Sequence, residues 1–118
     1  MTKRKEGEAK ESQIQTSIEH YLQFMENTGK LVYQKNQSGA FAVAHRGKTS
    51  YVRFGKKGSS DFLVWRKNNG HLETLFLEVK RPSGHQSESQ REFEGKIKTL
   101  GGHYVIVHSL EEVQKVLE

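Results

Sequence analysis

Two charged side chains, Glu78 and Lys80, follow the apolar run at residues 75 to 77, which is typical of a buried strand. Residues two apart on a strand share a face. The spacing therefore predicts that Glu78 and Lys80 stand together while Val79 enters the core. Because a charge is costly to desolvate, a buried strand seldom carries one without a use for it. Glu-x-Lys alone is more often a structural salt bridge, so its meaning depends on what lies nearby.

A second carboxylate, Asp61, precedes another apolar run at residues 62 to 65, and the Asn-Asn-Gly at residues 68 to 70 is a hairpin signal between the two runs. A hairpin brings Asp61 beside Glu78 and Lys80. The two carboxylates supply hard oxygen ligands for Mg²⁺ or Mn²⁺, an ion that polarises a phosphate and activates water. Lys80 would orient or deprotonate that water, or stabilise charge on the phosphate. The pattern predicts metal-assisted phosphodiester hydrolysis.

These residues resemble the motif of the PD-(D/E)xK nuclease superfamily, and their surroundings resemble its VRR-NUC branch, the virus-type replication-repair nuclease domain. The resemblance runs from Glu11 through Gly-Ser-Ser-Asp at residues 58 to 61 and Glu-Val-Lys-Arg-Pro at residues 78 to 82, to Gln90 and the Gly-Gly pair at residues 101 to 102. It covers nearly the whole chain, which looks like a stand-alone member. One departure is a serine where the superfamily name has proline, a residue that does no chemistry. The resemblance implies a restriction-endonuclease-like α/β fold, with a mixed central sheet flanked by helices.

Three polar residues outside the central motif have both a functional and a structural interpretation. Glu11 and Gln15 fall inside the apolar stripe of a helix expected over residues 10 to 27. Glu11 suits a first-turn carboxylate favoured by the helix dipole, but the resemblance places it in the catalytic and metal-binding set. Gln15 would support the site or contact DNA. Gln90 has capping-box spacing with Ser87, and the resemblance adds it to the catalytic residues.

Positive charge is concentrated between Lys30 and Lys67, where nine lysines and arginines accompany the single acid Asp61. This block has a net charge of +8. Because the whole chain has a net charge of +5, the remaining residues together carry −3. A basic block around one carboxylate suits a phosphate backbone approaching a metal ligand. The expected DNA-binding residues are Gln15, Arg46, Lys48, Arg53, Lys56, Lys57 and Arg81. A non-catalytic basic nucleic-acid-binding module is the alternative, although binding alone needs no acids facing phosphate. A small interaction protein with a salt-bridged sheet is a third interpretation, which the basic block disfavours.

The predicted elements form a single nuclease domain over residues 10 to 118, preceded by a charged terminus at residues 1 to 9 that we expect to be frayed. The expected strands lie at residues 31–35, 51–54, 62–65, 75–80 and 103–108, and the later helices at residues 87–100 and from 109 onward. Residues 36 to 57 suit either a hairpin arm or an ordered loop. Phe93, Ile97 and Leu100 are expected to supply the core face of the second helix.

Composition limits the setting in which the chain acts. Cysteine is absent and no apolar run approaches the length of a membrane span, so we expect no disulfide, no membrane and a reducing cytoplasm. With the resemblance we expect a viral or bacterial origin, activity at the nucleoid, Mg²⁺ or Mn²⁺ as cofactor, and the Val79 backbone carbonyl as a further metal ligand. Hydrophobic residues make up only 33% of the chain, and Phe24 lies off the main helical stripe, which indicates a partner subunit. Stand-alone members of the family are thought of as resolvase-like dimers, so we expect a homodimer that cuts branched DNA such as a Holliday junction.

Overall fold

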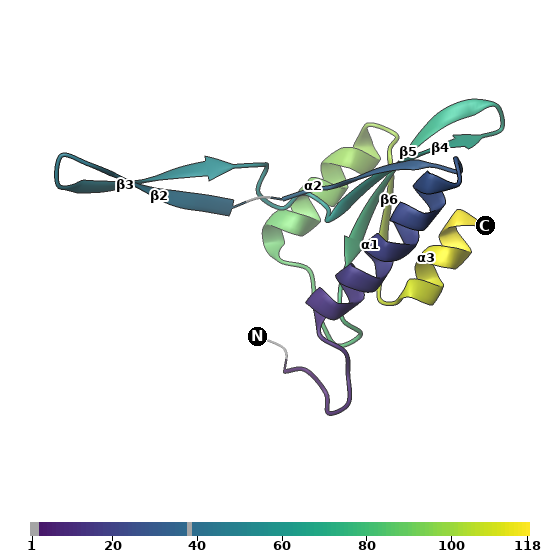
Figure 1. Ribbon diagram of the computed structural model, residues 1–118, viewed down its shortest axis with the longest axis horizontal. Coiled ribbons are helices and arrows are strands. Elements are labelled where there is room, and N and C mark those ends of the chain that lie inside the picture. The colour runs from purple at the N-terminus through teal and green to yellow at the C-terminus, as the bar shows by residue number, and fades with distance from the viewer. Residues whose placement is uncertain (1–2, 38) are drawn as a thin grey trace.

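The computed structural model describes residues 3–37 and 39–118, which form helices and strands in a mixed α/β order (Figure 1). In chain order these are α1 (Glu11–Asn27), β1 (Val32–Lys35), β2 (Gly39–His45), β3 (Lys48–Phe54), β4 (Phe62–Asn68), β5 (His71–Val79), α2 (Glu88–Thr99), β6 (His103–Val107) and α3 (Leu110–Leu117). The expected helix over residues 10 to 27 is confirmed, with Lys10 as its N-cap.

A four-stranded mixed sheet carries the core, in the order β1-β4-β5-β6. The pairs β1–β4 and β4–β5 are antiparallel, whereas β5 and β6 are parallel and α2 forms the crossover between them. The expected restriction-endonuclease-like architecture, a mixed central sheet flanked by helices, is therefore confirmed.

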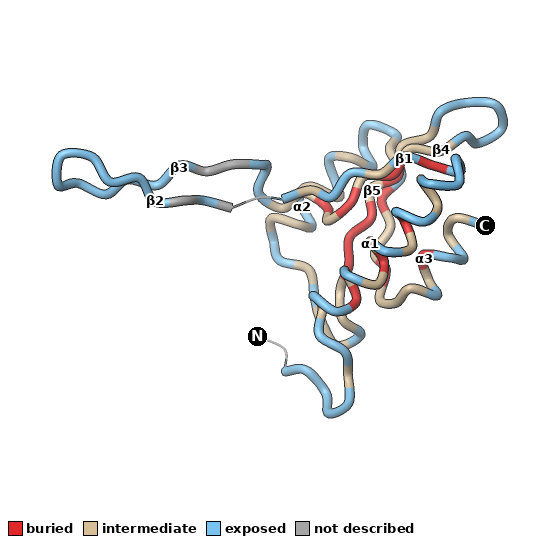
Figure 2. Tube along the Cα trace, viewed as in Figure 1, coloured by how far each residue is buried: buried red, intermediate tan, exposed pale blue. Residues whose placement is uncertain are grey.

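The two faces of the sheet pack against different helices because strand residues alternate between faces. Leu75, Leu77 and Val79 of β5 are buried in one cluster with Ile18 of α1 and Val113 of α3. On the opposite face, the ring of Phe76 contacts Phe93 of α2, with ring centroids 6.0 Å apart. Among the residues whose burial is described, the buried ones lie in this layered body (Figure 2).

The β4–β5 hairpin turns at the expected Asn-Asn-Gly. Asn69 and Gly70 have φ values of 51° and 81°, as a type I′ turn requires, and they connect the facing pair Asn68 and His71. The register then places Phe62, the first residue of β4, opposite Leu77 near the end of β5. The hairpin therefore brings the residue before β4 to the end of β5.

The strands β2 and β3 form a separate two-stranded arm that projects from the body (Figure 1). Arg46 and Gly47, with φ values of 52° and 75°, form its tip, and the two strands pair along seven residues each. Neither strand contacts any other helix or strand of the described residues. Of the two alternatives for residues 36 to 57, the hairpin arm is the one observed, and its second strand begins at residue 48 rather than 51.

One core prediction for α2 is wrong. Leu100 is 84% exposed, because the helix ends at Thr99 and Gly101 (φ 85°) turns the chain away. The contact of α2 with the sheet instead runs through Phe93, which packs edge-on against Phe76 and Tyr104.

Candidate active site

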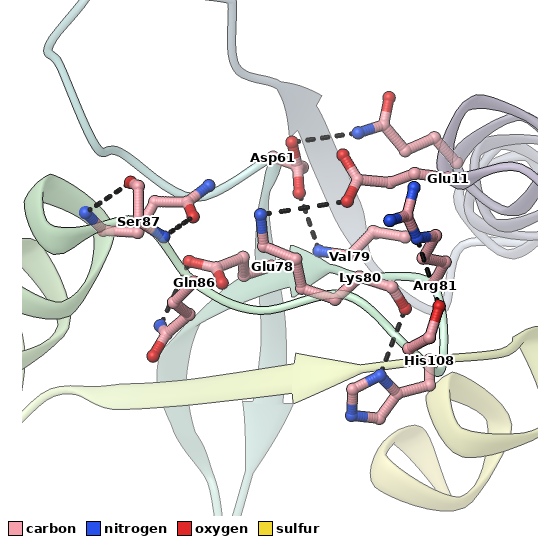
Figure 3. A network of polar contacts seen from close by, with 12 residues as sticks. Glu11, Asp61, Glu78, Val79, Lys80, Arg81, Gln86, Ser87 and His108 are labelled. Atoms are coloured by element: carbon pink, nitrogen blue, oxygen red, sulfur yellow. Dashed lines mark hydrogen bonds and ion pairs between the residues drawn. The ribbon is translucent and has the colours of Figure 1, made fainter. Parts of the chain in front are cut away.

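Asp61 lies immediately before β4 and joins three elements. Its Oδ2 accepts a hydrogen bond from the backbone N–H of Val79 at 2.7 Å, and its Oδ1 accepts one from Nε2 of Gln15 at 3.0 Å (Figure 3). The carboxylate is thus fixed between the end of β5 and the first helix. Two roles were expected for Gln15. The hydrogen bond to Asp61 agrees with the supporting role, and contact with DNA remains a prediction.

Gly58 allows the loop before Asp61 to pass close to α2. Its φ is +81°, and a Cβ there would collide with the backbone carbonyl of Ser89 and lie 2.6 Å from the Ser89 carbonyl carbon. Only glycine satisfies both the left-handed backbone and this contact. Gly58 therefore lets the chain turn sharply just before Asp61.

The environment of Asp61 raises the pKa of its carboxyl from 3.8 to about 6. Burial is the largest cause, and the negative charges of Glu11 and Glu78 act in the same direction. The hydrogen bond from Val79 and the positive charge of Lys80 oppose the rise. Burial and the neighbouring carboxylates therefore destabilise the ionised form of Asp61, and a nearby positive charge would offset this effect.

Glu78 is fully buried on the face of β5 that α2 covers. Its Oε1 accepts hydrogen bonds from the Tyr104 hydroxyl and, at 3.4 Å, from Nε2 of Gln86. Its Oε2 is buried and has no hydrogen-bond partner among the described residues. An unpaired buried carboxylate oxygen is costly, which identifies Oε2 as an atom that needs a ligand.

Lys80 follows β5 directly, and its backbone is held on both sides by β6 and the residue after it. The Lys80 N–H donates to the Val107 carbonyl at 3.0 Å, and the Lys80 carbonyl accepts from Nδ1 of His108 at 3.1 Å. The Lys80 side chain, only 12% exposed, places its ammonium 3.8 Å from Oε1 of Glu11. Figure 3 shows this side chain directed toward Glu11 and Asp61 rather than away from the site.

A cavity of about 630 Å³ opens beside Glu11 and Lys80. Its wall includes Glu11, Lys80, Arg81, His85, Gln86 and Gln90. Gln90 also closes the expected capping box: its N–H donates to Oγ of Ser87 at 3.2 Å, and its Oε1 accepts from the Ser87 N–H at 2.8 Å. The capping role of Gln90 is confirmed, and its place in the cavity wall leaves the predicted catalytic role open to test.

The expected DNA-binding residues fall into separate groups. Arg46 and Lys48 lie at the tip of the arm, and Lys56 and Lys57 lie in the loop beside the start of α2. Arg81 lines the cavity, where its Nε lies 3.9 Å from Oε2 of Glu8 and donates to Oγ of Ser83 at 3.3 Å. The side chain of Arg53 lies outside the described part of the structure.

The segment before α1 is attached to the loop after β5. Glu8 accepts hydrogen bonds from Ser83, from its N–H at 2.9 Å and from its hydroxyl at 2.5 Å. The Ser83 hydroxyl is the largest cause that holds the pKa of Glu8 below its usual value. Whether residues 1 to 9 fray remains a prediction about motion, but Glu8 is not a plain surface residue.

Sequence reasoning missed three residues that hold the site: Tyr104, Gln86 and His108. Two of them come from β6 and the residue after it, and the parallel register that sets Phe76 opposite Tyr104 fixes which side chains face β5. The apolar, β-branched run at residues 104 to 107 marks a strand, but its partner and register carry no local sequence signal. Gln86 lies in the loop before the Ser87 cap, and the sequence there does not indicate which side chains Gln86 would contact.

The oxygen atoms present fit a divalent metal ion. Glu78 offers the unpaired Oε2, and Asp61 is a partly buried carboxylate whose raised pKa a cation would lower. No group of three or more histidine, cysteine or acidic side chains converges as a metal site within residues 3–37 and 39–118. A divalent ion at this site would have the Asp61 and Glu78 carboxylates as side-chain donors, with the Val79 carbonyl and water as further donors. Glu11, predicted as a ligand, is paired with Lys80, and its role as a ligand remains untested.

The sheet order and the flanking helices define the class of the protein, a restriction-endonuclease-like α/β domain. The family model of the VRR-NUC domain matches residues 4–111, nearly the whole chain. The chain therefore belongs to the VRR-NUC family, a family of nucleases, and DNA is its implied substrate. No curated protein and no solved structure shows a match to the chain. Among the described residues, no helix has the length and apolar character needed to cross a bilayer.

Proposed function

We propose that this protein is a divalent-metal-dependent DNA endonuclease that hydrolyses phosphodiester bonds in branched DNA as a homodimer. The observation that carries the metal requirement is the buried Oε2 of Glu78, which lacks a hydrogen-bond partner among the described residues. Asp61, Glu78 and Lys80 lie close together at one end of the sheet, and Lys80 lines the adjoining cavity, which supports a metal-assisted reaction.

Each side chain in the site has a distinct part in the proposed reaction. Asp61 and Glu78 hold the Mg²⁺ or Mn²⁺ ion, which when bound polarises the scissile phosphate and lowers the pKa of a water molecule. Lys80 stabilises negative charge that develops on the phosphate. We favour this role over proton abstraction because the Lys80 ammonium is paired with Glu11 and donates rather than accepts. Glu11 keeps Lys80 in place.

The arm supplies the proposed contact with DNA away from the cut. Residues 39 to 60 contain five lysines and arginines and no acid. Tyr51 is 73% exposed on the arm, and none of the arm's described side chains belongs to the hydrophobic core. A two-stranded ribbon is marginal by itself and fits the major groove, so DNA is the partner whose charge and shape match.

The proposed dimer and branched substrate rest on two exposed apolar side chains. Phe24 of α1 is 62% exposed, and Val32 of the edge strand β1 is 54% exposed. Both are apolar residues on the outside of a body with a small core. One active site nicks one strand, and a two-fold dimer presents two sites to a junction of the same symmetry. Light scattering at micromolar concentration tests the dimer, and a monomer would refute it.

A cleavage panel tests the enzyme assignment. Linear, flapped and four-way DNA are incubated with the protein in Mg²⁺ or Mn²⁺, and we expect paired nicks in the four-way substrate. Asp61→Asn and Glu78→Gln should lose cleavage while they still bind DNA in EDTA. Glu6→Gln, a change of equal charge at an exposed position, is the control and should cut normally.

The panel also separates the alternatives. Binding of DNA without cleavage of any substrate in either metal would favour the non-catalytic binding module. Activity within a few-fold of the parent in Asp61→Asn or Glu78→Gln would refute the site assignment. Equal cutting of linear and four-way DNA would refute the branched substrate but leave the nuclease standing.

The arm contact has a test of its own. Replacing Arg46 and Lys48 together by alanine should weaken DNA binding and reduce the slope of log affinity against log salt by about 2. Lys115→Ala, at an exposed position on α3, is the control and should leave the slope unchanged. An unchanged slope in the arm variant would exclude these two residues from the interface.

A further inference from the structure

The buried carboxylate of Glu78 is held asymmetrically. One oxygen, Oε1, accepts from both Tyr104 and Gln86, while Oε2 has no partner among the described residues. Glu78 is fully buried, so water does not compensate the difference. The two oxygens therefore differ in hydrogen bonding: Oε1 is occupied by two donors, and Oε2 is left without one.

Tyr104 is well placed to impose this asymmetry because its ring cannot move freely. The ring stacks on Phe76 at 6.4 Å with an interplanar angle of 10°, and it meets Phe93 edge-on at 6.1 Å. Only 7% of Tyr104 is exposed. Its hydroxyl is the donor in the hydrogen bond to Oε1 of Glu78, because a carboxylate oxygen only accepts.

Gln86 gives a second, weaker support to the same oxygen. Its Nε2 lies 3.4 Å from Oε1 of Glu78 and 3.0 Å from Oε1 of Glu94. Glu94 is itself paired with Lys98 at 2.7 Å. The amide of Gln86 is thereby tied to α2 through Glu94.

We propose that Tyr104 is a positioning residue for the metal ion: it occupies Oε1 of Glu78 and so presents Oε2 as the single metal-binding oxygen, with Gln86 assisting. This inference rests on the proposed function, because it assumes that Glu78 binds a divalent ion. Hydrogen bonds from the surroundings orient metal ligands, and losing one typically costs 10- to 100-fold in metal affinity. Tyr104 touches neither substrate nor metal in this arrangement.

The test measures Mn²⁺ binding to the full chain by isothermal titration calorimetry, without DNA. We expect Tyr104→Phe to weaken Mn²⁺ binding by about 10- to 100-fold. Tyr33→Phe is the matched control, since the Tyr33 hydroxyl also donates to a carboxylate, Oε2 of Glu19 at 3.3 Å, but on β1 and outside the cavity. It should bind Mn²⁺ like the parent.

A second readout separates metal positioning from stability. The melting temperature of each variant is measured in EDTA and in saturating Mn²⁺, and Tyr104→Phe should show a smaller rise on metal addition than Tyr33→Phe. If Tyr104→Phe does not fold, Gln86→Leu takes its place, with a several-fold loss of Mn²⁺ affinity as the expected result.

The outcomes distinguish this inference from the function beneath it. A parent protein that binds no Mn²⁺ would refute the metal-dependent function and the inference with it. A parent that binds Mn²⁺ while Tyr104→Phe binds within twofold of it would refute the inference alone. In the replacement experiment, parent-like affinity of Gln86→Leu would refute it equally.

Discussion

Replacing Asp61 by asparagine should make the metal-free protein more stable while it removes cleavage. The folded protein raises the pKa of this carboxyl from 3.8 to about 6, chiefly by burial. One pH unit corresponds to about 1.4 kcal/mol, so the ionised side chain costs the folded state about 3 kcal/mol above pH 6. Asparagine carries no charge and avoids this cost.

The neighbours of Asp61 can accommodate asparagine. Its side-chain oxygen can still accept from the Val79 N–H, and a flip of the Gln15 amide lets the Gln15 oxygen accept from the new NH₂ group. We therefore expect the free energy of unfolding at pH 7.5 to rise by about 1 to 3 kcal/mol, measured by urea titration in EDTA.

The pH dependence gives the prediction its sign. A raised carboxyl pKa contributes stability that is fully present below the unfolded value of 3.8 and is lost as the pH rises through the folded value of about 6. The stability gained by Asp61→Asn should thus shrink below about 1 kcal/mol at pH 4, because the Asp61 carboxyl of the folded parent is then mostly protonated and as neutral as asparagine. Glu6→Gln, exposed and of equal charge change, should show no such trend. An Asp61→Asn protein that is less stable than the parent at pH 7.5, or an advantage that is the same at both pH values, would refute the electrostatic reasoning.

The other predictions concern the lysine, the first helix and the glycine loop. Lys80→Ala should slow single-turnover cleavage at least tenfold but leave Mn²⁺ affinity nearly unchanged, because the ammonium stabilises charge and binds no metal. A variant that loses Mn²⁺ affinity but cleaves at the normal rate would contradict this role of Lys80. Glu11→Gln should lower cleavage through Lys80 with little change in melting temperature, and parent-like activity would return Glu11 to a helix-dipole role. Gly58→Ala should cost more unfolding free energy than Gly70→Ala, because both have a φ of 81° but only Gly58 would collide with Ser89; urea titration giving equal losses would refute that contact.

The meeting of Asp61 with Glu78 and Lys80 was predictable because it depends on local signals. An Asn-Asn-Gly turn between two apolar runs specifies an antiparallel hairpin, and its two-residue loop sets the register. The helix caps were predictable for the same reason, since Ser87 and Gln90 interact three residues apart. Whether Asp61 and Glu78 bind metal cannot be read from either the turn or the caps.

Parts of the structure that depend on distant pairing were not predictable. Tyr104 reaches Glu78 only because β6 joins β5 in parallel, and the helix α2 that connects them leaves the register open. The arm gave no burial signal, because none of its described side chains, the exposed Tyr51 among them, belongs to the core. Sequence alone could therefore not choose between an arm and a loop.

The costly carboxylates of the site lie next to buried apolar residues in the sequence, because strand residues alternate between faces. Asp61 is adjacent to Phe62, and Glu78 is adjacent to Leu77 and Val79, and these three apolar residues are fully buried. Each costly carboxylate is thus held by neighbours that cannot shift without opening the core. A partly buried, ionised Asp61 and an unpaired Glu78 oxygen lower stability, but well-packed neighbours let the fold tolerate them. Because a bound cation would compensate both at once, its binding energy should appear as thermal stabilisation of the parent, and Asp61→Asn, already relieved of its charge, should gain much less from Mn²⁺.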